Sequence, residues 1–268
     1  MTDEQFDKLK ARLEQLLGLD LDAYKQAQMR RRITSYVTRV SNSIDEFIAD
    51  LGKDQDALAE LRDMITINVT EFFRDEAQWA QLRGSVLPDL IKERSALSIW
   101  SAGCSTGQEP YSLLMLLDGA SAMERSTVLA TDFDKEALAK ARAGGPYAAV
   151  EMKGVPQQDL DKHFDEGETG FTANANLRRR PKFKEVNLLK DRFGTNYDLV
   201  VCRNVMIYFT GEVKSALVGR FIDSLKPGGV LFIGATEALL GDDLTNVERL
   251  GGNFYRKRTD AQASSRAA

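Results

Sequence analysis

A glycine-containing turn and a later acidic residue are the first features of this sequence that could bind a small molecule. The turn runs from Ser101 to Glu109, between a strand-like segment and a helical one, and contains Gly103 and Gly107. Glycines in such a turn let the backbone approach a ligand closely, at the carboxyl edge of a parallel sheet. Asp132 ends the next strand-like segment, where its carboxylate is placed to accept hydrogen bonds from both hydroxyls of a ribose. The pattern therefore predicts a nucleoside site.

Glu109 indicates which nucleoside the site binds. The spacing matches neither the dinucleotide motif G-x-G-x-x-G nor the P-loop motif. Glu109 begins the helix after the turn, where a bound pyrophosphate would need a positive field. A carboxylate there repels phosphate but suits the ammonium group and nearby sulfonium of S-adenosylmethionine, so the electrostatics favour this methyl donor over NAD. Simpler explanations stay open: turn geometry for the glycines, a helix N-cap for Asp132 and a helix-dipole contact for Glu109.

The composition excludes several classes of site. The 268-residue chain has two cysteines, Cys104 and Cys202, and one histidine, His163. These are too few for a Cys/His zinc cluster or for most nucleophilic triads, so no metal is expected. The net charge of −4 gives the whole molecule no reason to bind nucleic acid or an anionic membrane. The absence of a signal-peptide core and of a membrane-spanning apolar run predicts a cytoplasmic protein with reduced thiols.

The elements that would position this site begin after a helical N-terminal segment. Residues 1–66 carry apolar side chains at helical spacing and little strand pattern, which predicts a small helical bundle. Gly18 is expected to end its first helix, and Ser43 to begin its third. Residues 67–95 are expected to form a linker and a further helix.

A parallel sheet is predicted for residues 96–258, where strand-like and helical segments alternate. This alternation is typical of a doubly wound, Rossmann-like α/β domain. The first and fourth predicted strands, 96–101 and 197–201, are neighbours in such a fold. Cys104 and Cys202 should therefore lie near one another at the carboxyl edge of the sheet.

Three segments depart from the alternation. Residues 144–182 contain several glycines and prolines and are expected to form a small inserted β-subdomain. Pro227-Gly228-Gly229 is expected to close the helix at 214–225. Residues 247–257 predict an antiparallel hairpin with a two-glycine turn, and a parallel sheet that ends in such a hairpin resembles the outline of the common methyltransferase fold. Residues 259–268 are small and polar, and a disordered tail is expected there.

Longer motifs include the glycine turn and Asp132, and others lie before and after them in the chain. They are NVTEFFRD at 68–75, WSAGCSTGQEPYS at 100–112, ATDFD at 130–134, NLL at 187–189 and CRNVMIYF at 202–209. Together they resemble the motifs of the chemotaxis-receptor glutamate O-methyltransferases, the CheR family, over roughly residues 6–256. The resemblance implies transfer of a methyl group from S-adenosylmethionine to receptor glutamates, yielding glutamate methyl esters and S-adenosylhomocysteine in sensory adaptation and signal transduction.

The resemblance also implies a role for individual positions. The implied cofactor-binding residues are Asn68, Thr70 and Arg74 over the cofactor, Gly103 and Glu109 at its methionine end, Asp132 at the ribose, Phe133, Asn187 and Leu188 at the adenine, and Cys202, Arg203 and Asn204 along the edge of the fourth strand. Arg74 and Tyr208 would lie nearest the transferring methyl group as catalytic residues. Packing under the loop would equally explain Tyr208, and tying the loop down would explain Arg74.

A basic cluster, Arg30, Arg31, Arg32 and Arg39, lies on one predicted helix. Most charge runs are solvated faces. The resemblance instead implies docking on the methylation region of the receptor's cytoplasmic coiled coil, and binding of the receptor's C-terminal tail to the β insertion. The compact insertion favours recognition of the receptor without its tail. The enzyme is expected to be a monomer that does not insert into a membrane. The alternatives are a non-catalytic S-adenosylmethionine-binding module, a nucleic-acid methyltransferase and, third, a dehydrogenase, which Glu109 disfavours.

Overall fold

The computed structural model of the chain describes residues 1–259, which fall into two compact units. One unit comprises residues 1–68 together with 208–214, and the other comprises, among the described residues, 69–207 and 215–259. The disordered tail expected at 259–268 lies, from residue 260 on, outside the described residues. Among the helices of residues 1–259, none combines the length and the apolar character needed to cross a membrane.

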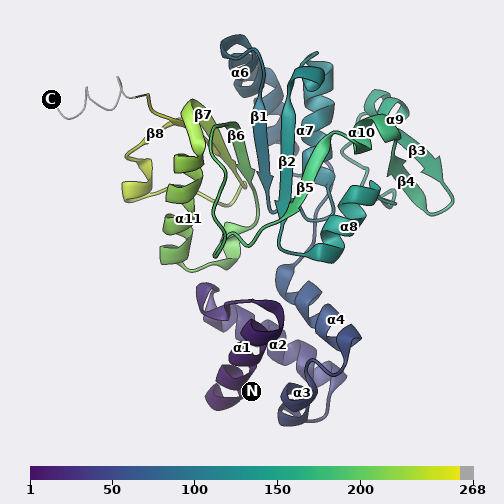
Figure 1. Cartoon of the computed structure of the whole chain (residues 1–268), viewed down its shortest axis with the longest axis vertical. Coiled ribbons are helices and arrows are strands. Elements are labelled where there is room, and N and C mark those ends of the chain that lie inside the picture. Colours follow the sequence, from purple (N-terminus) through teal and green to yellow (C-terminus); the bar gives the residue numbers. More distant parts are fainter. Residues whose placement is uncertain (260–268) are drawn as a thin grey trace. The chain divides into compact units, whose positions relative to one another are not determined.

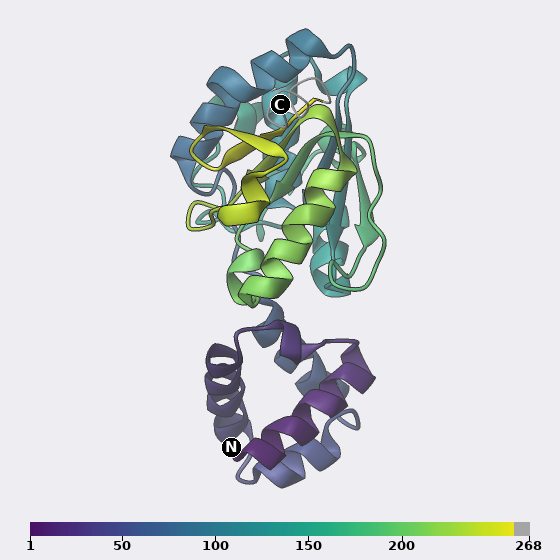
Figure 2. The same cartoon turned by 90° about the vertical axis from the view of Figure 1, so that its left-hand side faces the viewer.

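The first unit is built from helices (Figures 1 and 2). They are α1 (Asp3–Leu17), the short η1 (Leu21–Ala23), α2 (Gln26–Val40), α3 (Ile44–Asp50) and α4 (Gln55–Thr66). The predicted signals act as expected, since Gly18 ends α1 in a left-handed conformation and the Ser43 side chain caps α3. Tyr208–Lys214 belongs to this unit because the Tyr208 carbonyl accepts the Lys25 N–H at 2.9 Å and the Phe209 ring packs on Tyr24. The prediction of a helical bundle is confirmed.

The second unit contains a sheet of seven strands (Figure 1). The strands are β1 (Ser98–Ala102), β2 (Thr127–Asp132), β5 (Pro181–Glu185), β6 (Tyr197–Cys202), β7 (Leu225–Ile233), β8 (Val247–Gly251) and β9 (Phe254–Lys257). Their order is β5-β2-β1-β6-β7-β9-β8; the first five strands are parallel, and β9 and β8 form the antiparallel end. The doubly wound sheet and the terminal hairpin are therefore confirmed. β1 and β6 are neighbours, as the expectation for Cys104 and Cys202 required.

Helices cover both faces of the sheet because alternate strand residues point to opposite sides. The helices are α5 (Glu76–Gln81), which continues through the π-helical η2 (Leu82–Val86) into α6 (Leu87–Glu93), α7 (Gln108–Gly119), α8 (Lys135–Ala143) and α11 (Gly211–Ser224), with the short η3 (Met123–Arg125), η4 (Met206–Tyr208) and η5 (Gly241–Leu244). Ile99 and Leu199 share one core with Leu114 of α7. Trp100, the next residue of β1, packs instead on Phe221 of α11. The carboxyl ends of β1 and β6 are thus fixed between two apolar layers.

The insertion is small and partly antiparallel, as predicted. It contains α9 (Gln157–His163), β3 (Phe164–Gly167), β4 (Gly170–Ala173) and α10 (Ala175–Arg178), with β3 and β4 paired in a separate two-stranded sheet. Phe72 packs edge-on against Tyr147 and Phe164 at ring distances of 5.0 and 5.3 Å. His163 lies 3.1 Å from the Asp118 carboxylate of α7. The single histidine therefore anchors the insertion.

The end of α11 differs from the expectation. Pro227-Gly228-Gly229 does not close the helix, because α11 ends at Ser224 and β7 begins at Leu225. The three residues lie inside an irregular stretch of β7, where the pairing with β6 shifts between Tyr197 and Leu199. A proline and two glycines suit such an irregularity, since neither residue type supports regular strand pairing.

Candidate active site

The glycine turn after β1 folds back on β2 and packs against the turn that follows β6. The backbone N–H groups of Gly103 and Cys104 both donate to the Thr131 carbonyl, at 2.8 and 2.9 Å. Gly103 has φ +84°, and a Cβ at this position would lie 2.4 Å from Cγ2 of Val205. A side chain is therefore excluded at residue 103 both by conformation and by space.

Asp132 closes this turn with its carboxylate. Its Oδ2 accepts the Ser105 N–H at 2.7 Å, and its Oδ1 accepts the Asp134 N–H at 2.9 Å. Burial raises the pKa of Asp132, while these backbone hydrogen bonds oppose the rise. The N-cap explanation for Asp132 is wrong, because the side chain that caps α8 is that of Asp134. Each carboxylate oxygen of Asp132 has a second lone pair that can accept a further hydrogen bond.

Glu109 is a buried carboxylate in the first turn of α7. Its side chain accepts the Ser101 hydroxyl at 2.7 Å and lies 3.8 Å from a guanidinium nitrogen of Arg203. Burial raises the pKa of Glu109 to about 7, although Arg203, Ser101 and Arg74 favour its charged form. A cation bound beside Glu109 would bring this pKa down again.

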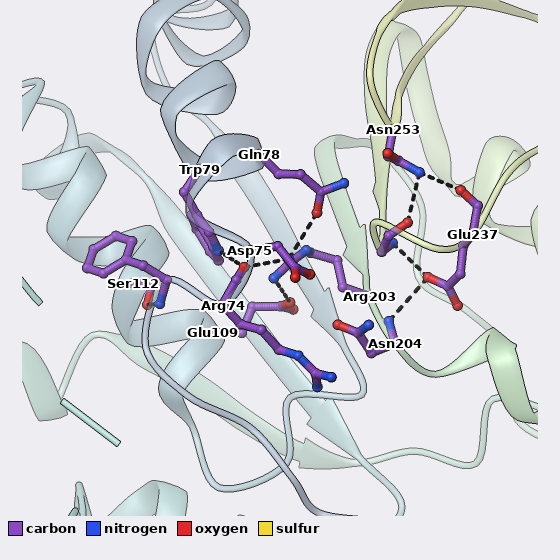
Figure 3. Close-up of polar contacts among 12 residues, drawn as sticks. Arg74, Asp75, Gln78, Trp79, Glu109, Ser112, Arg203, Asn204, Glu237 and Asn253 are labelled. Carbon is purple, nitrogen blue, oxygen red and sulfur yellow. Dashed lines mark hydrogen bonds and ion pairs between the residues drawn. The ribbon is translucent and has the colours of Figure 1, made fainter. Parts of the chain in front are cut away.

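Arg203 joins the end of β6 to the linker that precedes α5, and Figure 3 shows it at the centre of these contacts. Its guanidinium donates to the Arg74 carbonyl at 2.6 Å, to the Asp75 carboxylate at 2.9 Å and to Oε1 of Gln78 at 3.0 Å. It also lies over the ring of Trp79. Burial lowers the pKa of Arg203, but an arginine remains charged in any such environment. Arg203 is therefore a buried cation that holds the linker onto the edge of the sheet.

The linker itself is held in a strained conformation. Phe73 and Asp75 have φ values of +52° and +62°, which residues other than glycine rarely adopt. The Phe73 N–H donates to the Ser112 hydroxyl of α7 at 3.1 Å, and the Arg74 side chain turns back to the Val69 carbonyl at 3.0 Å. Strain of this kind is retained where a site requires it.

A second polar group, which the sequence did not single out, joins the ends of β6 and β7. The Glu237 carboxylate is 3% exposed and accepts the backbone N–H groups of Gly234 and Asn204 at 2.6 and 3.2 Å. The Asn253 side chain donates to the Gly234 carbonyl at 2.8 Å (Figure 3). An acidic residue near the carboxyl end of an apolar strand, like Asp132 at the end of β2, was the signal that could have identified Glu237.

The structure brings most of the predicted residues to the carboxyl edge of one sheet. These are Arg74, Gly103, Glu109, Asp132, Phe133, Asn187, Leu188, Cys202, Arg203 and Asn204, all in the second unit. Thr70 belongs to the same unit, and its part in the site stays a prediction. Asn187 follows β5, and the loop reaches Asp132 through the Val186 N–H, which donates to the Asp132 carbonyl at 2.9 Å. Asn68 and Tyr208 belong to the first unit, so their part in the site stays a prediction.

The two cysteines are not candidate nucleophiles. Burial raises the pKa values of Cys104 and Cys202 well above the ordinary thiol value, so both stay protonated at neutral pH. Within the part of the chain that the structure describes, no group of three or more His, Cys, Asp and Glu side chains could hold a metal ion.

The fold and the site define an S-adenosylmethionine-dependent methyltransferase. The sheet is parallel with an antiparallel end, a glycine turn follows β1, and acidic residues lie at the start of α7 and at the end of β2. Residues 4–66 match the family described as "CheR methyltransferase, all-alpha domain", and residues 68–252 match "CheR methyltransferase, SAM binding domain". The chain belongs to the CheR methyltransferase family. The prediction of S-adenosylmethionine rather than NAD is thereby confirmed, and the dehydrogenase alternative is wrong.

Similar proteins cover nearly the whole chain. A "Chemotaxis protein methyltransferase" of Listeria monocytogenes is 39% identical over 243 residues, which are 90% of this chain and 92% of the relative. "Chemotaxis protein methyltransferase 1" of Pseudomonas aeruginosa is 34% identical over 268 residues, covering 94% of this chain and 97% of the relative. The chain is therefore a methyltransferase of chemotaxis, and the predicted class of enzyme is confirmed.

Proposed function

We propose that this methyltransferase acts on glutamate side chains in the cytoplasmic methylation region of chemoreceptors, giving glutamate methyl esters and S-adenosylhomocysteine. Family membership supports this substrate. The observation in the structure that carries the proposal is a pair of carboxylates beside the glycine turn after β1, the buried Glu109 and the half-buried Asp132. An acidic lining suits a cationic nucleoside and repels a pyrophosphate.

The residues of the edge fit S-adenosylmethionine, which supplies a methyl group activated by a positive sulfur. Gly103 would let the methionine portion approach the backbone, and Glu109 would bind its ammonium group. Asp132 has acceptor capacity left for the ribose hydroxyls. The remaining members of the proposed site are Phe133, Asn187 and Leu188 at the adenine, Cys202, Arg203 and Asn204 along the edge of β6, and Asn68, Thr70 and Arg74 from the linker.

The acceptor needs no general base. A glutamate side chain has an ordinary pKa of about 4.3 and is ionised at neutral pH. Its oxygen attacks the methyl carbon, the carbon–sulfur bond breaks, and the bonding electron pair stays on the sulfur, which becomes a neutral thioether. No proton moves in this step. The protein's task is to align the carboxylate and to exclude water.

Arg74 and Tyr208 are the proposed catalytic residues. The Arg74 side chain is half-buried and donates to the Val69 carbonyl. A guanidinium has five N–H groups, so further ones can steer a substrate carboxylate. A tight bidentate grip would lower the nucleophilicity of that carboxylate, so a single hydrogen bond is the more effective contact. Tyr208 would orient the second carboxylate oxygen through its hydroxyl group.

Helix α2 is the proposed docking surface for the receptor. Arg31 and Arg39 are exposed, whereas Arg30 donates to Asp3 and to the Met1 carbonyl, and Arg32 donates to the Met64 carbonyl. The two exposed arginines would therefore supply most of the attraction to an acidic coiled coil. The small β3–β4 insertion favours recognition of the receptor without its C-terminal tail, and the enzyme would act as a monomer.

Calorimetric titration with S-adenosylhomocysteine tests the cofactor site. The wild type should bind, and Asp132→Ala should bind at least tenfold more weakly, because a buried charged partner of the ligand is lost. Asp165→Ala, which removes an exposed aspartate from β3, is the matched control and should bind normally. A well-folded wild type that does not bind would contradict the proposed function.

The methylation product tests the acceptor. Receptor fragments incubated with enzyme and radiolabelled S-adenosylmethionine should take up label that mild alkali releases as methanol, because carboxylate esters hydrolyse under these conditions. Alkali-stable label would show a different acceptor atom. Arg31→Glu with Arg39→Glu should raise KM for the fragment and reduce its dependence on salt, while Lys53→Glu should change neither.

A further inference from the structure

Glu237 is a buried carboxylate to which neither the motifs nor the proposed chemistry gives a role. It lies four residues after the end of β7, and its side chain is 3% exposed. Glutamate is almost never this buried unless its charge is matched by specific partners, because burial of an isolated charge is costly. A residue held in this way has a structural or a functional reason to be acidic.

Hydrogen bonds hold both the carboxylate and the backbone of Glu237. Its Oε2 accepts the N–H groups of Gly234 and Asn204 at 2.6 and 3.2 Å, and its own N–H donates to the Gly234 carbonyl at 3.0 Å. The Asn253 side chain donates to the carbonyls of both Gly234 and Glu237, and the Asn253 carbonyl accepts the Ile233 N–H at 3.1 Å. Figure 3 shows this chain of bonds running from the terminal hairpin to the end of β6.

The bond to Asn204 controls a turn of unusual conformation. Asn204 has φ +59°, in the left-handed region that few residues other than glycine and asparagine adopt. A Cβ added at Gly234 would lie 2.8 Å from the Asn204 nitrogen, so the ends of β6 and β7 meet at backbone contact. The Glu237 carboxylate is the acceptor that satisfies the Asn204 N–H in this position.

The same turn touches the cofactor loop. Val205 follows Asn204, and its Cγ2 occupies the space beside Gly103. Any shift of Asn204 would move Val205 either into the glycine turn or away from it. The contact thus connects Glu237, through one hydrogen bond and two residues, to the loop proposed to hold the methionine end of the donor.

The charge of Glu237 acts on the same groups. Its field favours the charged form of Arg203, the residue before Asn204, and contributes to raising the pKa of Glu109. A glutamine at 237 would keep the shape of the side chain while losing this charge, which allows the two contributions to be separated.

We propose that Glu237 is a positioning residue of the methyl-donor site, whose carboxylate holds the turn after β6 in the conformation that packs against the glycine turn after β1. The inference rests on the proposed function, because it assigns the donor to that edge of the sheet. Glu237 would contact neither donor nor acceptor. Its effect would fall on donor affinity and not on the methyl-transfer step.

The test uses the full chain with Glu237→Gln and Glu237→Ala. The matched control is Glu248→Gln, which removes the same charge from an exposed position on β8. S-adenosylhomocysteine affinity is measured by calorimetry, KM and kcat by methyl transfer to receptor fragments, and folding by thermal unfolding. We expect Glu237→Gln to raise both the Kd for S-adenosylhomocysteine and the KM for S-adenosylmethionine by about tenfold. The value of kcat at saturating donor should stay within about twofold, and the control should match the wild type.

Two failures can be told apart. If the folded wild type does not bind S-adenosylhomocysteine, the proposed function fails and this inference fails with it. If the wild type binds and folded Glu237→Gln binds equally well, only the inference is overturned. Glu237→Ala is expected to bind at least as weakly as Glu237→Gln. If both variants simply fail to fold, or if they lower kcat with an unchanged KM for the donor, Glu237 is not a positioning residue for the donor.

Discussion

Glu109 makes donor binding depend on pH in a direction that can be worked out from the structure. In the ligand-free protein burial raises the pKa of Glu109 from 4.5 to about 7, so the carboxyl group is partly protonated at neutral pH. The ammonium group of a bound ligand favours the charged form and lowers this pKa. Binding therefore releases a proton, and affinity increases as pH rises towards 7 and levels off above it.

The expected size follows from proton linkage. If the pKa is about 7 in the free protein and well below 6 in the complex, affinity for S-adenosylhomocysteine should increase about tenfold between pH 6 and pH 8. At pH 7 binding should release about half a proton. Glu109→Gln removes the titrating group but keeps an acceptor for the Ser101 hydroxyl, so this contribution should vanish while the affinity falls.

Calorimetry in two buffers of different ionisation enthalpy measures both quantities. The wild type and Glu109→Gln are titrated at pH 6, 7 and 8, and the difference between them isolates Glu109 from the ligand's own amino group. A wild-type affinity that is flat or falls with pH would refute the reasoning. A variant that keeps the full tenfold rise would show that another group is responsible.

Three further changes have clear expected results. Glu109→Gln should raise the unfolding free energy of the ligand-free protein by about 3 kcal/mol at pH 8 but little below pH 4.5. The reason is that a carboxyl group whose pKa is raised in the folded state destabilises the fold progressively as pH rises from 4.5 to 7. Urea denaturation at both pH values checks this. Gly103→Ala should lose about 1–3 kcal/mol of stability and most of the ligand affinity, because its Cβ would meet Val205 at 2.4 Å. Gly84→Ala, at a helical position with open space, is the control and should keep ligand affinity without any loss of stability. Arg220→Ala should speed amide exchange in residues 188–193, because its guanidinium bonds the Leu188 and Asp191 carbonyls and lies 3.9 Å from the Phe193 ring centre.

Local chemistry explains why so much of the fold could be predicted from the sequence. Gly18 and Ser43 end and begin helices by mechanisms that depend on one or two residues, and alternating apolar segments require a parallel sheet. The glycine turn and Asp132 were recognisable because both lie at strand ends, where a doubly wound fold forms its site. Pro227 was not the residue that ends the helix, because α11 already stops at Ser224, where Leu225 begins β7 and pairs with Tyr197 of β6.

The polar network behind the site could not be predicted in the same way. Arg203 bonds to Asp75 and Gln78, which precede it by more than 120 residues, and Glu237 bonds to Asn204 across two strand ends. No periodicity or local motif connects these positions. Only the adjacency of β1, β6 and β7 brings them together, so their partners follow from the sheet order and not from spacing along the chain.

The position of Arg203 explains why the linker motif and the motif at the end of β6 belong to one site. The linker holds Phe73 and Asp75 in strained conformations, which would relax if nothing opposed them. Arg203 opposes this by bonding the Arg74 carbonyl and the Asp75 carboxylate together, and its burial among aromatic rings leaves it few alternative partners. The backbone of Arg74, a residue proposed to steer the acceptor, is therefore fixed from the same strand end that borders the proposed donor site. Substitution of Arg203 should therefore weaken binding of the glutamate acceptor and of the methyl donor together. If the two motifs acted independently, only one of the two affinities would fall.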